Sequence, residues 1–172
     1  MKTFEELLKP VYPELVRYSR AMAGSSADGD DLLQDALLNA WRKVHTLRDP
    51  DGFKFWMLKI IKNANISRER SRKFKSWIGL EAIQRIPASE PMSYEDKDLV
   101  RTALAKVPKD QREAVILYEI LGMSVKEIAK QQKASESAVK NRLSRGRKRL
   151  RVEVSALTTL EKGHGQAFAE SC

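Results

Sequence analysis

The pattern of apolar and polar positions along the chain predicts helices throughout. Between residues 12 and 23 apolar side chains recur at helical spacing, and Pro10 and Pro13 place the start of this helix near residue 12. A break at residues 24–26 separates it from a second helix, predicted from near Asp28 to residue 47. The buried stripe of the second helix is expected to consist of Leu33, Leu37, Ala40, Trp41 and Val44. A turn at residues 48–52 then precedes a third long helical segment.

The periodicity stops between residues 78 and 97 and returns at residue 98. Pro and Gly interrupt residues 78–97, which are predicted to form a flexible linker. A flexible joint in an ordinary two-domain protein would have a similar composition. Beyond it Pro108 must end one helix, and Asp110 is expected to cap the next, with Glu113 completing a variant of the capping box. The apolar residues at 115–121 occupy nearly every face of that helix, so we expect the helix to lie at the centre of a small bundle. The helix is expected to end at Gly122.

Residues 122–151 have the pattern of a helix-turn-helix. Ser124 and Glu127 form a capping box ahead of a short helix, and Ser135 is expected to cap a longer, basic one. The buried stripe of the basic helix is predicted to be Val139, Leu143 and Leu150. Its cations then face outward, as in a helix that enters the DNA major groove, although a solvated basic helix in an ordinary bundle would have a similar pattern.

These elements predict an all-α protein with two small helical domains joined by a flexible linker. The expected ranges are 1–77 for the N-terminal domain, 78–97 for the linker and 98–154 for the helix-turn-helix domain. Residues 155–172 contain two glycines and no sustained apolar stripe, so they are predicted to form a tail without regular structure.

The positive charge of the chain is concentrated in two stretches. The net charge is +9, but residues 54–75 alone contain eight Lys and Arg against one acid, and residues 130–151 contain nine against one. These stretches carry +7 and +8, which leaves −6 on the remainder. Such a distribution indicates two contacts with a polyanion. A membrane surface would also attract them, but neither stretch has a broad apolar face along its length.

Several functional classes have little support in the composition. Cys172 is the only cysteine, and His45 and His164 are far apart, so we expect no disulfide, metal or cofactor. The acids at 28–31 suit a helix N-terminus, which leaves a nuclease or other enzyme without a candidate active site. The N-terminus contains acids where a signal peptide is apolar, and no apolar run approaches ~18 residues, so a cytoplasmic location without membrane insertion is expected.

Aromatic and cationic residues alternate in the segment 53–77. Unstacked bases bind to aromatic faces and their phosphates to cations, so this composition is typical of single-stranded nucleic acid binding. Four members have helix-core spacing and are expected to be buried: Trp56, Met57, Ile60 and Ile61. A different face is predicted on the preceding helix, where one leucine stands among acids and amides. It is either plain solvent surface or a docking face for a partner protein.

Two blocks of sequence resemble the conserved domains of bacterial sigma factors. DLLQDALLNAW, a Pro-containing turn, FKFWMLKIIKN and the basic run after it are similar to the helical promoter-melting domain of that family (region 2). VPKDQREAVILYEILGMSVKEIA and SESAVKNRLSRGRKRL are similar to its C-terminal helix-turn-helix domain (region 4). With both in family order over roughly 8–76 and 98–152, the chain resembles the extracytoplasmic-function (ECF) group of the sigma-70 family.

The resemblance implies a transcription initiation factor that binds core RNA polymerase, directs it to specific promoters and helps to melt the minus-ten element. Its expected partners are promoter DNA, the β′ clamp helices and β flap of the polymerase, and an anti-sigma factor. The alternative is a helix-turn-helix regulator that binds duplex DNA without the polymerase.

The same resemblance implies three sets of site residues. The residues implied for docking on the polymerase are Asp31, Gln34, Asp35, Leu38 and Asn39. Minus-ten binding and melting fall to Lys54, Trp56, Lys59, Lys62, Asn63, Asn65, Ser67, Arg68, Arg70, Arg72 and Lys73. Minus-thirty-five recognition falls to Ser135, Glu136, Ser137, Lys140, Asn141, Arg142, Arg145, Arg147 and Lys148.

The sequence departs from the family pattern at several positions. Ser67 replaces a common Asp after the melting segment, and Ser137-Ala138 replaces a common Gly-Thr at the start of the recognition helix. Gln132 replaces an apolar residue under the turn. Lys133 occupies the usual Gly position of the turn, where a left-handed lysine would cost roughly 1 kcal/mol. These departures predict a less rigid turn and an unusual base preference.

Overall fold

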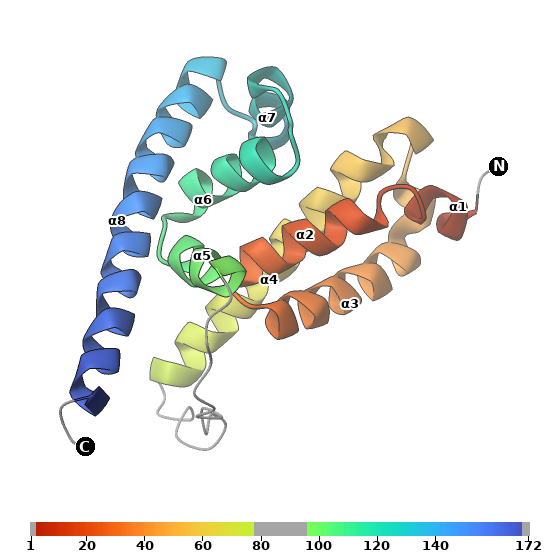
Figure 1. Ribbon diagram of the computed structural model, residues 1–172. Coiled ribbons are helices and arrows are strands. Elements are labelled where there is room, and N and C mark those ends of the chain that lie inside the picture. Colours follow the sequence, from red (N-terminus) through yellow and green to blue (C-terminus); the bar gives the residue numbers. More distant parts are fainter. Residues whose placement is uncertain (1–2, 78–95, 170–172) are drawn as a thin grey trace.

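Two groups of helices lie side by side in the computed structural model, which describes residues 3–77 and 96–169 (Figure 1). The N-terminal group contains α1 (Phe4–Leu8), α2 (Tyr12–Ala23), α3 (Ser26–Lys43) and α4 (Phe53–Trp77), with the short turns η1 (Val44–Thr46) and η2 (Pro50–Gly52) between α3 and α4. The C-terminal group contains α5 (Asp96–Ala105), α6 (Lys109–Val115), the π-helical turn η4 (Ile116–Ile120), α7 (Val125–Gln132) and α8 (Glu136–Ala169). The described residues include no strand, so the all-α prediction is confirmed for them.

Local capping sets the starts of the N-terminal helices. The predicted start at Tyr12 is confirmed. The Ser25 side chain accepts a hydrogen bond from the backbone N–H of Asp28, so α3 begins at Ser26, slightly earlier than expected. A separate helix, α1, precedes α2, and a capping box between Thr3 and Glu6 stabilises its N-terminus.

The N-terminal core is formed where α2, α3 and α4 meet. Leu33 and Ala40 are buried as predicted, but Trp41 is 65% exposed, so its assignment to the core was wrong. The inward face of α3 is centred instead on Leu32, Leu33, Ala36 and Ala40. Gly29 allows α3 to approach α2 closely, because a Cβ at this position would lie 2.3 Å from the Cα of Arg20. On α4, Met57 and Ile61 are buried as expected, whereas Trp56 and Ile60 are only partly buried.

The helix-turn-helix has the predicted caps. The Ser124–Glu127 capping box is present, Gly122 has φ +65°, and the hydroxyl of Ser135 accepts from the N–H of Ala138 at the start of α8. Lys133 adopts the left-handed conformation, with φ 50° and ψ 48°. Val139 and Leu143 are buried.

Three expectations for the C-terminal half need correction. Pro108, not Asp110, occupies the cap position of α6, and no side chain caps that helix. The predicted capping box with Glu113 is also wrong, because Glu113 is only 1% exposed and lies in the contact between the two halves. The tail prediction is wrong for residues 155–169, where α8 continues; glycine costs a helix only about 1 kcal/mol, so two glycines do not end it. The predicted linker falls almost entirely on residues 78–95, outside the described residues.

The two halves pack on one another. One continuous hydrophobic cluster includes Leu15 and Met22 from α2 together with Leu104 and Ile116 from the C-terminal half. In Figure 1 α5 lies beside α2, and α8 runs along one side of the molecule past α5 and α6. We refer to this packed arrangement as the closed arrangement.

Candidate nucleic-acid interface

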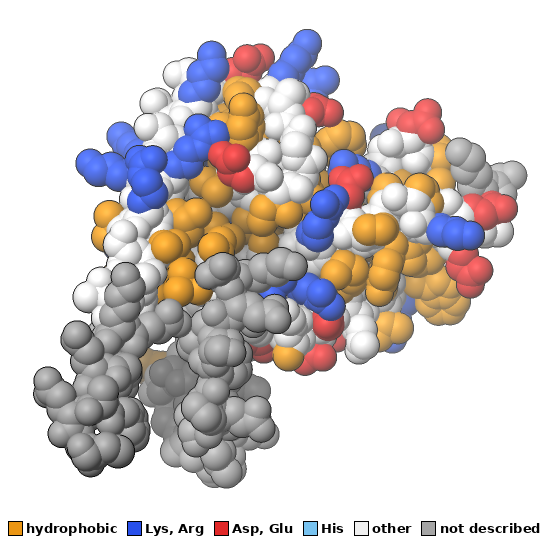
Figure 2. Space-filling view, in the orientation of Figure 1, with side chains coloured by type: hydrophobic (Ala, Val, Ile, Leu, Met, Phe, Trp, Pro, Cys, Tyr) orange, Lys and Arg blue, Asp and Glu red, His pale blue; other side chains and the backbone are white. Residues whose placement is uncertain are grey.

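The first turns of α8 present most of the candidate minus-thirty-five residues to solvent. Lys and Arg side chains gather over α7 and the adjoining end of α8 (Figure 2). The exposed members of the set are Ser135, Glu136, Ser137, Lys140, Asn141, Arg145 and Lys148. Their exposure follows from the burial of Val139 and Leu143 on the opposite side of the helix. This face of α8 is therefore positively charged and open to a polyanion.

Two arginines of the same helix have partners within the C-terminal half. Arg142 donates from Nη1 to Oε1 of Gln132 at 2.8 Å, and its Nη2 lies 3.5 Å from Asp110. Arg147 pairs with Glu119 at 2.6 Å and lies 5.1 Å from the ring centroid of Tyr118. Both side chains are partly buried, so their positions are more restricted than those of the neighbouring cations.

One face of α4 carries an exposed polar, cationic and aromatic stripe. The exposed candidates for the minus-ten element are Lys59, Asn63, Ser67, Arg70, Arg72 and Lys73. Helical spacing extends the line through Asn63, Ser67 and Arg70 to Phe74 and Trp77, which are 60% and 83% exposed. Their ring centroids lie 6.3 Å apart. Aromatic rings next to exposed cations are suited to unstacked bases and their phosphates.

Other candidates on α4 are held by acids or buried. Lys54 pairs with Glu14, Lys62 with Glu113 at 2.6 Å, and Arg68 with Asp35 at 2.5 Å. Trp56 is partly buried and packs on Phe53, with centroids 5.9 Å apart.

Asn65 is the one candidate that the structure places in the interior. It is 2% exposed and donates to Glu69 at 3.2 Å. In the closed arrangement its amide is directed to Glu69, but Asn65 also lines the pocket between α3 and α4, so its part in DNA binding stays a prediction.

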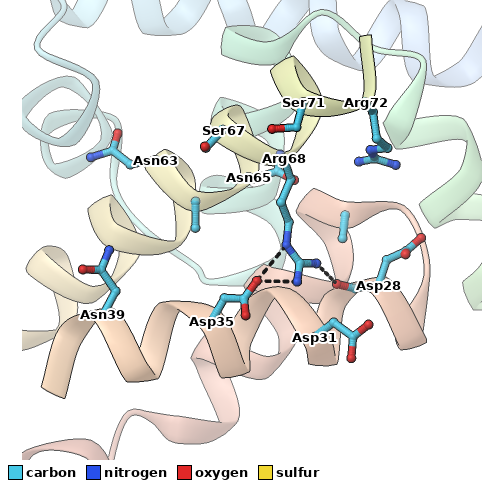
Figure 3. Close-up of a pocket in the computed structure, with 12 residues that line it drawn as sticks. Asp28, Asp31, Asp35, Asn39, Asn63, Asn65, Ser67, Arg68, Ser71 and Arg72 are labelled. Carbon is cyan, nitrogen blue, oxygen red and sulfur yellow. Dashed lines mark hydrogen bonds and ion pairs between the residues drawn. The ribbon is translucent and has the colours of Figure 1, made fainter. Parts of the chain in front are cut away.

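The acidic face of α3 lies directly beside the polar face of α4 (Figure 3). Asp31, Gln34, Asp35 and Leu38 are exposed, Leu38 by 59%, and Asn39 is partly exposed. A pocket between the two helices is lined by residues from the docking set and from the minus-ten set, and Arg68 reaches across it to Asp35 and to the backbone carbonyl of Asp28. The two predicted surfaces therefore share an edge.

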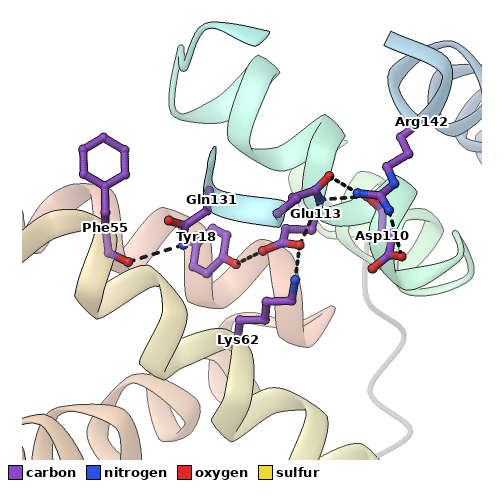
Figure 4. Close-up of polar contacts among 8 residues, drawn as sticks. Tyr18, Phe55, Lys62, Asp110, Glu113, Gln131 and Arg142 are labelled. Carbon is purple, nitrogen blue, oxygen red and sulfur yellow. Dashed lines mark hydrogen bonds and ion pairs between the residues drawn. The ribbon is translucent and has the colours of Figure 1, made fainter. Parts of the chain in front are cut away.

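A buried carboxylate joins the two halves of the molecule (Figure 4). Glu113 on α6 accepts hydrogen bonds from Lys62 on α4, from the hydroxyl of Tyr18 on α2 at 3.4 Å and from Gln132 on α7 at 2.9 Å. Burial and the adjacent Glu113 carboxylate raise the pKa of Tyr18 well above its usual 10.0, so the hydroxyl keeps its proton and acts as the donor.

A second ionic cluster connects α4 with α6. Glu69 lies 2.5 Å from Lys109 and 3.1 Å from Arg112, whose side chain is 6% exposed. Arg112 also donates to the backbone carbonyl of Met22 at 3.3 Å. Burial opposes ionisation of Glu69, but the hydrogen bonds and charges of Lys109 and Arg112 outweigh it and lower the pKa of Glu69 below its usual 4.5.

Sequence reasoning missed the residues of these two contacts. Glu113 and Arg112 were read as parts of an ordinary helix start, and Gln132 only as a departure from an apolar position. One signal was present: an adjacent Arg–Glu pair at the start of an otherwise apolar helix implies buried partners for both charges. Nothing local indicated that the partners would lie on α2 and α4.

The described residues offer no place for a metal ion, since no group of three or more His, Cys, Asp or Glu among them could hold one. Within the same part of the chain, no helix is long and apolar enough to cross a membrane.

Comparison with known proteins identifies the class and then the group. Residues 7–75 match the family model for sigma-70 region 2, and residues 97–150 match the model for sigma-70 region 4. The chain is thus a sigma-70 family protein. It is 32% identical over 147 residues to the ECF RNA polymerase sigma factor SigM of Mycobacterium tuberculosis, a match that covers 86% of this chain and 74% of that one. The chain belongs to the ECF group of RNA polymerase sigma factors.

Other relatives agree with this placement. The ECF sigma factor SigE of Mycolicibacterium smegmatis is 29% identical over 161 residues, covering 88% of this chain and 61% of that protein. Among solved structures, the sigma factor RpoE in complex with the anti-sigma factor NepR from Bartonella quintana superposes with a TM-score of 0.70 and 28% identity, covering 90% of this chain and 98% of that one. CnrH in complex with the cytosolic domain of CnrY gives 0.64 and 25%, with coverages of 89% and 88%.

Proposed function

We propose that this protein is a promoter-specificity subunit that binds core RNA polymerase, brings it to particular promoters and helps to melt the minus-ten element. The observation that carries the proposal is the presence of both sigma regions in one chain, each with its own exposed cationic face. A factor of this kind works by binding and not by catalysing a reaction. It acts where the polymerase is, in the cytoplasm.

The exposed face of α3 is the docking surface for the polymerase in this proposal. Leu38 supplies an apolar anchor and Asp31 and Gln34 a polar surround, an arrangement typical of protein interfaces. The β′ clamp helices are the expected partner of this face, and the β flap that of the C-terminal domain.

The exposed stripe of α4 receives the minus-ten element, and the first turns of α8 enter the major groove of the minus-thirty-five element. Melting removes base stacking worth roughly 1.4 kcal/mol per step. Stacking of unpaired bases on aromatic side chains contributes about 1–3 kcal/mol each, so each captured base offsets the stacking lost at about one step.

The closed arrangement is the form that precedes promoter binding. Lys62 is engaged by Glu113 across the domain contact, so it must leave Glu113 before it binds a phosphate. An anti-sigma factor that stabilises this arrangement would keep the chain from its promoter. One solved relative with a similar overall structure, RpoE from Bartonella quintana, was determined with such a partner.

Reconstitution tests the proposal. The purified chain is combined with core RNA polymerase and offered a library of random promoter fragments, and transcripts are mapped to their start sites. We expect a small set of promoters that share two sequence elements. Absence of core binding together with absence of directed transcription would refute the proposal. Tight operator binding by the free chain, with no contribution from the polymerase, would instead support the stand-alone regulator.

A further inference from the structure

Gln132 makes hydrogen bonds through both ends of its side-chain amide. Its Nε2 donates to the backbone carbonyl of Asp110 at 3.0 Å and to Oε2 of Glu113 at 2.9 Å, and its Oε1 accepts from Nη1 of Arg142 at 2.8 Å. A carbonyl and a carboxylate only accept, so the nitrogen end must face Asp110 and Glu113. The orientation of the amide is therefore fixed by chemistry, and its oxygen necessarily faces Arg142.

Arg142 lies at the edge of the DNA-facing surface of α8. Its side chain is 27% exposed, and it lines a pocket with the exposed residues Asn141 and Arg145. An arginine without a partner samples many rotamers, and ordering it costs up to about 2 kcal/mol of side-chain entropy. The bond to Gln132 orders the Arg142 side chain before DNA binds, so less entropy is lost on binding. The other N–H groups of the guanidinium remain able to donate to a base edge.

Glu113 connects this pair to the other domain. Lys62 and Tyr18, both from the N-terminal helices, bind the same carboxylate that orients Gln132 (Figure 4). A continuous series of hydrogen bonds thus runs from α2 and α4 through Glu113 and Gln132 to Arg142. A change in the domain contact alters the partners of Glu113, and through them the surroundings of Gln132.

We propose that Gln132 is a positioning residue for Arg142 in minus-thirty-five recognition, and that Glu113 links this positioning to the contact between the two domains. The inference rests on the proposed function and assigns a role to a residue that departs from the apolar pattern at the turn. Gln132 itself does not read a base. It sets the orientation of the arginine that does.

The test measures base preference, which a merely structural role would not alter at a single position. Holoenzyme is assembled from core polymerase and the full chain, and its affinity is measured for duplex promoter fragments found by start-site mapping, with each base pair of the upstream element replaced in turn. Arg142→Ala identifies the base pair that Arg142 reads. A good arginine–base contact contributes discrimination of about 5- to 150-fold.

Gln132→Leu keeps the approximate size of the side chain and removes its hydrogen bonds. We expect it to lose discrimination at the same base pair as Arg142→Ala, with no further loss when the two changes are combined. The matched control is Gln131→Leu, because Gln131 bonds across the domain contact to the backbone carbonyl of Phe55 at 3.3 Å and lies outside the series of bonds that runs through Glu113 to Arg142. The control should keep wild-type preference at every position.

Two results would overturn the positioning role. One is wild-type preference in Gln132→Leu at the position that Arg142→Ala loses, and the other is an equal loss of affinity at all positions. Failure of the wild-type holoenzyme to select any promoter would count against the proposed function instead, so the two failures are distinguishable.

The link through Glu113 is tested in the free chain with Tyr18→Phe, which removes one hydroxyl and leaves the DNA-facing residues unchanged. We expect the side-chain amide resonances of Gln132, assigned with Gln132→Leu, to shift in NMR spectra of this variant. Ser19→Ala, a neighbouring buried hydroxyl that bonds to the carbonyl of Val16, serves as the control. Unshifted Gln132 resonances in Tyr18→Phe would show that Glu113 does not link Gln132 to the domain contact.

Discussion

The ionic cluster of Glu69 with Lys109 and Arg112 should decide how much of the free protein is closed. In the closed arrangement the Arg112 side chain is 6% exposed and contacts Glu69 and the backbone carbonyl of Met22. Glu69→Gln removes the negative charge but keeps the shape of the side chain. Arg112 would then be buried with one neutral acceptor in place of a carboxylate. The variant should therefore favour an open arrangement, in which the two halves have separated and water solvates the guanidinium.

The size of the effect follows from the burial of each partner. Loss of one member of a buried ion pair costs about 3–5 kcal/mol. The pair with Lys109, which is 47% exposed, adds at most about 1 kcal/mol. The glutamine oxygen still accepts a bond from Arg112 and recovers part of this. We expect a net cost of about 2–3 kcal/mol, or roughly 30- to 150-fold in the ratio of closed to open molecules.

Single-molecule energy transfer measures this ratio directly. Dyes attached at Lys43→Cys on α3 and Ser155→Cys on α8, in a Cys172→Ser background, report the separation of the two halves at exposed positions. The matched control is Glu119→Gln, which removes a half-exposed ion pair with Arg147 inside the C-terminal half. If Glu69→Gln gives the same distribution as Glu119→Gln and the wild type, the cluster does not hold the domains together.

Three further outcomes follow from single sites. Because the pKa of Glu69 is lowered in the closed form, the stabilisation of closure by Glu69 is complete above pH 4.5 and is lost as the pH falls through the lowered pKa. Acid titration of the dye-labelled chain should show the two halves separating in that range. The Glu69→Gln variant should lack this transition. Lys133→Gly should raise the free energy of unfolding by about 0.5–1 kcal/mol in urea melts, whereas glycine at the helical Lys130 should lower it by about 1 kcal/mol. Leu38→Ala should weaken core polymerase binding by about 1–2 kcal/mol in titrations, whereas Val152→Ala, at an equally exposed position on α8, should not.

The elements that depend on local sequence could be predicted. The Ser124–Glu127 capping box and the left-handed Gly122 each follow from a few adjacent residues, and both are present. The left-handed Lys133 was implied by the resemblance to the family's turn and is also present. Helix-core spacing likewise placed Met57 and Ile61 in the interior. Such features arise within one or two turns of helix and need no knowledge of the rest of the chain.

The errors occur where partners distant in sequence decide the outcome. Trp41 has suitable spacing for the core, but α3 packs on α2 and α4 through the face that carries Leu32, Ala36 and Ala40, and this leaves residue 41 outward. Glu113 has a plausible local role as a cap, but its partner Tyr18 lies 95 residues away. The periodicity of one helix cannot specify a partner on another, so the domain contact and the hydrogen bonds to Gln132 lay beyond sequence reasoning.

The closed arrangement also changes what the basic composition of α4 means for DNA binding. Lys62 and Arg68 contribute two of the eight positive charges of residues 54–75, but each already binds a carboxylate. A cation that exchanges a carboxylate for a phosphate gains little, because one charge-assisted bond replaces another and the displaced acid must be solvated again. Fewer phosphates are then neutralised than the charge count suggests, so the closed chain should bind DNA with a shallower salt dependence than the open one. Lys62 is freed by domain opening, whereas Arg68 is freed only if Asp35 takes another partner. If the polymerase docks on α3 next to Asp35 as proposed, it would act on a cation of the proposed minus-ten surface. The edge that the two surfaces share would then give polymerase binding a direct route to DNA binding.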